Sequence, residues 1–362
     1  MRSSPVISAC SLLTPLDRAP GKTTWQALCA GERVGTRAAV AEELLRGEKE
    51  LDRSVRLALA AVERLGRTDL KKAHLFCGTS KGPVGTFLAG LENLRAGGGG
   101  GALTQMQAKH VALGVGAMAA ILREQLEMDA PAHTSVAACS SGLHALHRAA
   151  AAIERGECDR ALVVAADASL HPLFEGSFTR LGVLAPADAQ GSRRCQPFGQ
   201  AGEGFFLVEA AAAVVVENSR GEKSDVRSHN SDVAIERTWI GGDSTGLIAI
   251  DEKTRTLRAG LRAARREQEL AFVHAHATGT AHDRYELAAI RAELGDHVKV
   301  FSHKKWLGHS LGAAGLVGVV ISAMCHREGH TPAGATVRPA ARSLTIAQGF
   351  GGHVGLVELR GT

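Results

Sequence analysis

Val136-Ala137-Ala138-Cys139-Ser140-Ser141-Gly142 is the stretch of this 362-residue chain from which the fold and the site can be worked outward. Residues 133–138 predict a strand that ends here, and residues 142–155 predict a helix that begins directly afterwards. Cys139 falls in the turn between them, beside the unpaired N–H groups of the first helical turn. That position predicts a lowered thiol pKa and a place that can hold the oxyanion of an attacked thioester. A buried structural cysteine is the alternative that this segment leaves open.

Short apolar runs alternate with helical patterns on both sides of this stretch, which predicts an α/β protein with buried strands. Further strands are expected at residues 6–13, 73–77, 160–166, 205–217 (one or two strands), 234–240, 271–275, 298–302 and 355–359. Further helices are expected at residues 55–65, 109–126, 254–269, 283–294 and 313–326. Five glycines at 97–101 predict a flexible loop, and the polar segment 219–233 predicts a linker. The chain is therefore expected to divide into residues 1–218 and 219–362, two halves with a similar order of elements.

The composition excludes several classes of protein. Hydrophobic residues make up 45% and charged residues 22%, typical of a soluble globular protein, and no apolar run is long enough for a membrane span. The net charge of +5 comes with one Tyr and three Trp, which disfavours nucleic-acid binding but suits an acidic protein partner. Seven widely spaced cysteines predict no disulfide framework. We expect a cytoplasmic protein.

A second motif, Val273-His274-Ala275-His276-Ala277-Thr278-Gly279-Thr280, carries His276 out of a predicted strand into a turn of small residues. The hydroxyls of Thr278 and Thr280 can bond at close range there. Asp283 and Glu286 follow three residues apart, on one face of the next helix. A satisfied core histidine is the alternative for His276. No second pair of ligands has metal-binding spacing, so no metal site is predicted.

A third motif runs from Lys304 to His309 and into Gly312-Ala313-Ala314-Gly315, again between a predicted strand and a helix. The small residues predict close packing of that helix, and by itself Lys304 is more simply a solvated surface charge. Together, Cys139, His276 and His309 can converge on one pocket. No carboxylate is clearly placed to orient a histidine, which favours stabilisation of an enolate over activation of water.

These motifs, in this order, resemble those of the β-ketoacyl synthases of the thiolase superfamily, in the elongating branch that has His at both positions. Gly349-Phe350-Gly351-Gly352 resembles the family's last loop. The resemblance implies a thiolase-like, five-layered αβαβα fold with two related halves, and either a homodimer or a heterodimer with another ketosynthase. It implies decarboxylative condensation of an acyl group on Cys139 with malonyl-acyl carrier protein, with no bound cofactor and with substrates on the carrier's phosphopantetheine. The implied catalytic residues are Cys139, His276, His309 and Lys304; the implied substrate-binding residues are Thr278, Thr280, Gln348, Gly349 and Phe350.

The chain departs from the family pattern at two positions near the site. Gln348 stands where the family has an aromatic gatekeeper, and Gly318 stands where it has a Glu paired with the lysine. We therefore expect Lys304 to lack its usual partner, and the acyl group to be other than an ordinary fatty acyl chain. A non-catalytic or chain-length-setting subunit of a heterodimer is the main alternative. A thiolase or cysteine acyl hydrolase is a second alternative, although a thiolase would need a further Cys where His353 stands.

Overall fold

The described part of the chain forms ten strands, in two sets of five that have the same order. The computed structural model describes residues 4–18, 21–35, 38–66, 68–97, 114–219, 233–265 and 270–361. The first half supplies β1 (Pro5–Leu13), β2 (His74–Gly78), β3 (Ala132–Ser135), β4 (Arg160–Asp167) and β5 (Ala210–Asn218). The second supplies β6 (Val233–Gly242), β7 (Leu270–His274), β8 (Val300–Phe301), β9 (Arg342–Gly349) and β10 (His353–Gly361).

The two sets of strands have the same topology. Their orders are β3-β2-β4-β5-β1 and β8-β7-β9-β10-β6, and β1 pairs with β6 at only two positions, through Val6 and Ile7. In each set the first three strands are parallel and the last two run antiparallel to their neighbours. Because the carboxyl ends of parallel strands meet at one edge, the loops after β2, β3 and β4 lie at one edge of the first set, and those after β7, β8 and β9 lie at one edge of the second.

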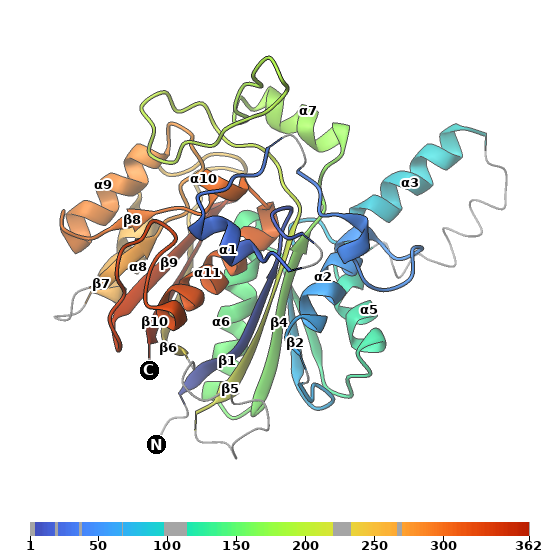
Figure 1. The fold of residues 1–362 in the computed structure, drawn as a ribbon, viewed down its shortest axis with the longest axis horizontal. Helices are drawn as coiled ribbons and strands as arrows, with labels where there is room; N and C mark the ends of the chain where they lie inside the picture. Colours follow the sequence, from blue (N-terminus) through green and yellow to red (C-terminus); the bar gives the residue numbers. More distant parts are fainter. Residues whose placement is uncertain are drawn as a thin grey trace.

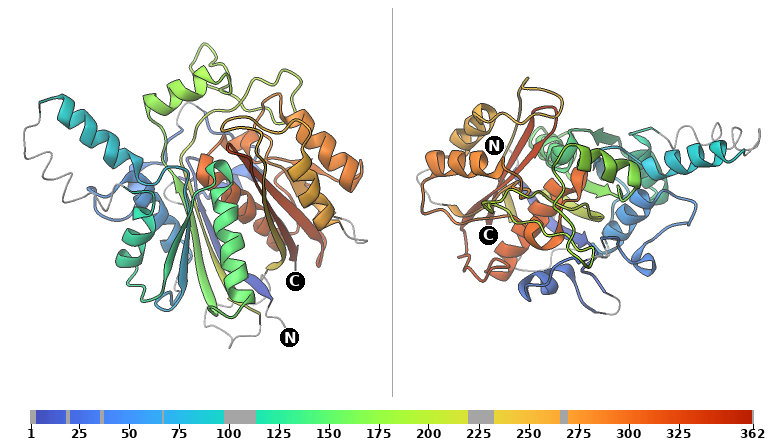
Figure 2. Two further views of the ribbon diagram at one scale, coloured as in Figure 1. Left: turned by 180° about the vertical axis from the view of Figure 1, so that it is seen from behind. Right: turned by 90° about the horizontal axis from the view of Figure 1, so that it is seen from above.

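Helices form three further layers around these sheets. The chain forms α1 (Thr24–Cys29), α2 (Arg53–Glu63), α3 (Val84–Arg95), α5 (Ala117–Gln125), α6 (Ser141–Glu154), α7 (Pro172–Arg180), α8 (Arg255–Ala264), α9 (Asp283–Leu294), α10 (Lys304–Leu307) and α11 (Ala314–Glu328). Helices α6 and α11 lie between the sheets, α2 and α5 cover the outer face of the first, and α8 and α9 cover that of the second (Figures 1 and 2). The buried apolar residues form one cluster for each of these helical layers. This is the five-layered αβαβα arrangement of the thiolase-like fold.

The two central helices approach closely because glycines face each other's backbone. A Cβ added at Gly142 would lie 2.8 Å from Leu316 Cβ and 2.9 Å from its backbone nitrogen. A Cβ at Gly315 would lie 2.6 Å from Leu143 Cδ1. The predicted close packing of the helix after His309 is confirmed.

Most of the predicted elements are present, but some strands are shorter than predicted and some elements were not predicted. The strand expected at 133–138 ends at Ser135, since the chain turns at Ala138, and the strands expected at 205–217 and 298–302 shorten to β5 and β8. The elements that were not predicted include α3, α7, α10 and β9. Strand β9 was missed because its polar residues are buried with partners, as in the Arg342–Glu358 ion pair, and so break the apolar pattern. Most of the predicted glycine loop and of the predicted linker lies outside the described residues.

No helix among the described residues combines the length and the apolar character needed to cross a membrane.

Candidate active site

Cys139 lies where the sequence predicts it, between β3 and α6. The chain makes a short 3-10 turn, Ala138–Ser140, and α6 begins at Ser141. Ala138 has a φ of +47°, a left-handed conformation that L-residues with a side chain rarely adopt. The Cys139 Sγ lies 3.2 Å from Nε2 of His309, 170 residues further along the chain. The fold thus forms the thiol–imidazole pair that nucleophilic catalysis requires.

The prediction of a lowered pKa for Cys139 is wrong. Burial raises the pKa of the thiol to about 11, and the Asp167 carboxylate also raises it, while the charges of Lys81 and Lys304 lower it. Removal from water disfavours the thiolate more than these two cations favour it. Cys139 is therefore a neutral thiol at physiological pH, and it must give up its proton as it reacts.

The loop that carries His276 is held by two buried carboxylates. Glu286 accepts hydrogen bonds from the backbone N–H groups of His276 and Ala277, both at 2.8 Å. Asp283 accepts bonds from the backbone N–H groups of Phe198, Thr278 and Gly279 at 2.8–2.9 Å. Burial, together with the neighbouring Asp283, raises the pKa of Glu286 to about 7. Both residues thus shape the His276 turn through its backbone rather than orienting the imidazole.

His309 packs against an aromatic ring and lies near the second histidine. Its ring meets the Phe205 ring edge to face, with centroids 4.8 Å apart, and the His276 ring lies 5.6 Å away. The His309 N–H donates to the carbonyl of Phe206 at 2.8 Å. Burial and the charge of Lys304 hold the pKa of His276 and of His309 well below the ordinary value. The site therefore contains two neutral imidazoles beside a neutral thiol.

Lys304 is buried, which corrects its reading as a solvated surface charge. Only 2% of the residue is exposed, and its ammonium group donates to the carbonyl of His276. Burial lowers the pKa of Lys304, while the carboxylate of Glu286 raises it. The charge of Glu286 on α9 thus acts on Lys304, whereas Gly318 on α11 has no side chain to pair with it.

The last loop of the chain packs against the nucleophile turn through Gly349. A Cβ at this position would lie 2.6 Å from the carbonyl oxygen of Ala137 and 3.1 Å from the nitrogen of Cys139. Gln348 is buried in β9, and Phe350 is half-buried after it. On the other motif, the hydroxyls of Thr278 and Thr280 lie 3.1 Å apart. The structure brings these predicted binding residues to the loops around Cys139 and His276; their contact with substrate stays a prediction.

Sequence reasoning assigned no role to Lys81, which lies in the loop after β2. Its ammonium group bonds Ser80 Oγ at 2.9 Å and Ser169 Oγ at 3.1 Å, and it lies 4.9 Å from the centre of the Phe174 ring. The carboxylate of Asp167 accepts from both serines, linking the two charges. The Thr79-Ser80-Lys81 turn after a strand was a visible signal, but only the fold brings it to the Cys139 side.

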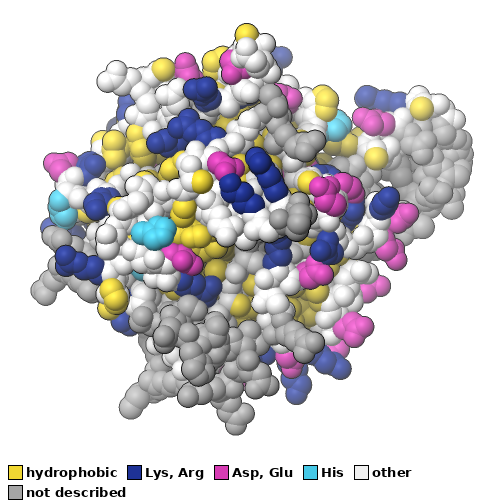
Figure 3. Space-filling model, in the orientation of Figure 1, with side chains coloured by type: hydrophobic (Ala, Val, Ile, Leu, Met, Phe, Trp, Pro, Cys, Tyr) yellow, Lys and Arg dark blue, Asp and Glu magenta, His cyan; other side chains and the backbone are white. Residues whose placement is uncertain are grey.

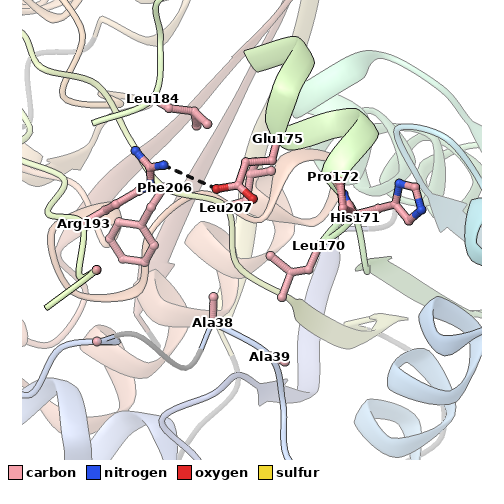
Figure 4. Close-up of a pocket in the computed structure, with 12 residues that line it drawn as sticks. Ala38, Ala39, Leu170, His171, Pro172, Glu175, Leu184, Arg193, Phe206 and Leu207 are labelled. Atoms are coloured by element: carbon pink, nitrogen blue, oxygen red, sulfur yellow. Dashed lines mark hydrogen bonds and ion pairs between the residues drawn. The ribbon is translucent and has the colours of Figure 1, made fainter. Parts of the chain in front are cut away.

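A pocket of about 390 Å³ adjoins the candidate centre (Figure 4). Its walls come from the start of α7 and the residues before it (Leu170, His171 and Pro172), from Phe206 and Leu207, and from Arg193 and Ala38. Arg193 crosses the pocket to Glu175, with an N–O distance of 3.4 Å. Phe206 and Leu207 connect it to His309, because they contact that residue through the backbone. In the described residues, no three His, Cys, Asp or Glu side chains are grouped as a metal site.

Comparison with known proteins bears on this arrangement. Residues 41–221 match the model of the β-ketoacyl synthase N-terminal domain, and residues 242–338 match that of the C-terminal domain. A polyketide β-ketoacyl synthase homologue from Streptomyces halstedii is 29% identical over 281 residues, 70% of this chain and 66% of the relative. The 3-oxoacyl-[acyl-carrier-protein] synthase 2 of Coxiella burnetii is 29% identical over 217 residues, 57% of this chain and 51% of the relative. The chain thus spans between half and two thirds of these relatives.

Among solved structures, the ishigamide ketosynthase/chain length factor superposes with a TM-score of 0.84 at 22% identity, covering 100% of both chains. This similarity shows that the fold is shared. With half of the chain matched by the N-terminal domain model, and a further segment by the C-terminal one, the chain belongs to the β-ketoacyl synthase family.

Proposed function

We propose that this protein catalyses decarboxylative Claisen condensation between an acyl group held on Cys139 and malonyl-acyl carrier protein. The observation that carries the proposal is the convergence of the Cys139 thiol, the His309 imidazole 3.2 Å away and the His276 imidazole, all neutral, beside the buried Lys304 ammonium. The product would be a 3-oxoacyl-acyl carrier protein two carbons longer. It would serve fatty acid, polyketide or related lipid biosynthesis.

In the first half-reaction, Cys139 attacks the thioester that joins an acyl group to the phosphopantetheine of a carrier protein. The sulfur of Cys139 forms a bond to the acyl carbon, and the phosphopantetheine thiolate leaves. His309 Nε2 takes the proton of Cys139 and returns it to the leaving thiolate. The Cys139 N–H, beside the backbone of Gly349, is placed to bind the oxyanion.

In the second half-reaction, the malonyl group loses CO₂ and leaves an enolate. The neutral imidazole of His276 can donate an N–H to the enolate oxygen, and that of His309 can do so once its hydrogen has moved from Nδ1 to Nε2. The charge of Lys304 favours formation of the enolate. The enolate carbon then bonds to the acyl carbon, the Cys139 sulfur leaves, and one proton is taken up to restore the thiol.

An acidic carrier protein and a second ketosynthase subunit are the partners that we propose. A hollow of about 450 Å³ is lined by four basic side chains and one acidic side chain: Arg33, Arg193, Arg194, Lys305 and Asp188. Figure 3 shows one face of the molecule, on which some Lys and Arg side chains gather near the middle and others are interspersed with Asp and Glu. The Arg-rich helix α8 is a poorer carrier site, because Arg258 and Arg262 are paired with Glu293 and Arg255 with Asp251. Locally concentrated positive charge suits an acidic protein.

We also propose that residues 1–218 form the half that carries the nucleophile and residues 219–362 the half that carries both histidines. Strands β1–β5 and strands β6–β10 have the same order, and the proposed boundary lies between β5 and β6. This repeat supports the division. We propose a cytoplasmic protein, which is supported by seven cysteines that are all free.

The test is to incubate the protein with a series of acyl carrier proteins and malonyl carrier protein, alone and with a second ketosynthase. Mass spectrometry should detect an acyl adduct on Cys139 and a product extended by two carbons. Cys139→Ala should abolish both. Absence of an adduct and of a product at every chain length, with unchanged yield from a partner complex that contains Cys139→Ala, would favour a non-catalytic, chain-length-setting subunit.

A further inference from the structure

Four buried polar side chains form a hydrogen-bonded series that begins at His303, the residue before Lys304. The reaction proposed above does not use them. His274 Nε2 lies 2.9 Å from His303 Nδ1, and His274 Nδ1 lies 3.0 Å from Ser322 Oγ. Ser322 Oγ in turn lies 2.9 Å from Thr345 Oγ1. None of the four residues is more than 2% exposed. A fully buried polar network stabilises one arrangement of its members, because each broken bond would leave a polar atom unsatisfied.

The hydrogen-bond pattern determines the protonation of this chain. The backbone N–H of His303 donates to His274 Nε2 at 3.2 Å, so this nitrogen carries a lone pair. The ring Nδ1 of His303, which meets the same nitrogen, must therefore carry the hydrogen. Burial and the charge of Lys304 lower the pKa of His274 to about 3 and that of His303 well below its ordinary value. Both rings are neutral. His274 carries its hydrogen on Nδ1, which faces Ser322 Oγ, and its ring also bonds the backbone of Gly318.

This geometry ties the first residues of α10 to the end of β7. His274 receives both the backbone N–H and the ring N–H of His303, and the next residue, Lys304, donates to the carbonyl of His276. Residues 274–276 and 303–304 thus close a ring of hydrogen bonds. The position of the Lys304 ammonium relative to the His276 turn depends on the imidazole of His274.

The His274 ring also lies beside the space that a side chain at position 318 would enter. A Cβ built on Gly318 would lie 3.2 Å from Thr345 Cγ2 and 3.7 Å from His274 Cε1. A neutral imidazole thus lies next to Gly318, where α11 has no side chain. The imidazole holds α10 in place without adding a charge next to Lys304.

We propose that His274 is a positioning residue, which places the Lys304 ammonium against the His276 turn by binding both N–H groups of His303. The inference rests on the proposed function for its effect on rate, but not for its effect on the thiol. Since the Lys304 charge lowers the pKa of Cys139, the pKa of that thiol reports where the ammonium lies, even in an inactive protein.

The first experiment therefore measures alkylation of Cys139 by iodoacetamide against pH, in the full-length protein. His274→Ala should shift the curve to higher pH and slow alkylation at pH 8 by roughly two- to tenfold. Lys304→Met should do the same, and His274→Ala should add nothing in the Lys304→Met background. Equal, additive effects of the two substitutions, or no shift with His274→Ala, would overturn the proposal.

The second experiment separates the two half-reactions. His274→Ala should slow CO₂ release from malonyl carrier protein roughly tenfold, about the effect of one lost hydrogen bond, and leave acylation of Cys139 within about twofold. His274→Gln keeps an acceptor for His303 and should restore most of the rate. His326→Ala is the matched control, because His326 is also a largely buried histidine bonded to a serine, Ser343, at 2.8 Å.

Equal loss of both half-reactions in His274→Ala, with full activity in the control, would show a merely structural role. If His274→Ala does not fold, Ser322→Ala removes one partner of the His274 ring. It should also slow CO₂ release while acylation is retained, but by a smaller factor. An inactive wild-type protein contradicts the proposed function alone, since the alkylation curves still decide the position of Lys304.

Discussion

The protonation state of Cys139 leads to a prediction that separates this site from one built on a thiolate. With its pKa raised to about 11, roughly one thiol in a thousand is ionised at pH 8, against roughly one in ten for a thiol at the ordinary value of 9.0. A thiolate of higher pKa is more nucleophilic, which offsets this hundredfold deficit by about tenfold. Cys139 should therefore react with iodoacetamide roughly ten times more slowly than a free thiol at pH 8.

The assay is alkylation between pH 6 and 11, followed by mass spectrometry of the peptide that contains Cys139, with Cys139→Ala to assign the signal. The rate should rise about tenfold per pH unit up to about pH 10. Acylation by a thioester should instead vary little between pH 6 and 9, because the neutral Cys139–His309 pair is then the reacting species. An alkylation rate that levels off below pH 8 would refute the reasoning and show that the helix N-terminus outweighs burial.

Three further predictions follow from single contacts. Lys81→Met removes a charge that lowers the pKa of Cys139, so alkylation at pH 8 should slow severalfold relative to wild type; an unchanged rate would place Lys81 out of range. Gly349→Ala puts a Cβ 2.6 Å from the carbonyl of Ala137, so acylation of Cys139 should fall at least tenfold while circular dichroism stays native; retained acylation would contradict the role of this close approach. Gly142→Ala forces α6 away from Leu316 and should lower the free energy of unfolding by about 1–3 kcal/mol, measured by urea denaturation, whereas an unchanged midpoint would show that the helices can separate freely.

Much of the fold and of the candidate centre can be predicted from the sequence, because the signals are local. Apolar runs that alternate with helical periodicity mark buried strands and their crossover helices. Small residues after a strand mark turns, and this places Cys139 and His276 shortly after β3 and β7; His309 instead follows the short helix α10. The short Gly/Ala run after His309 predicts a closely packed helix, and α11 packs in this way.

The tertiary structure alone decided the chemistry of those side chains, because pKa values and partners depend on neighbours distant in sequence. Cys139 looked activated from its place before a helix, yet burial, which a sequence does not show, raises its pKa instead. Lys304 looked like a solvated charge, yet the fold buries it, and the charge of Glu286 acts on it there. The His274–His303 pair joins residues 29 apart, and Lys81 reaches the site from another loop. The local sequence pattern determines which helices and strands form. Only the folded chain determines which ionisable groups are buried close to one another, and so their pKa values.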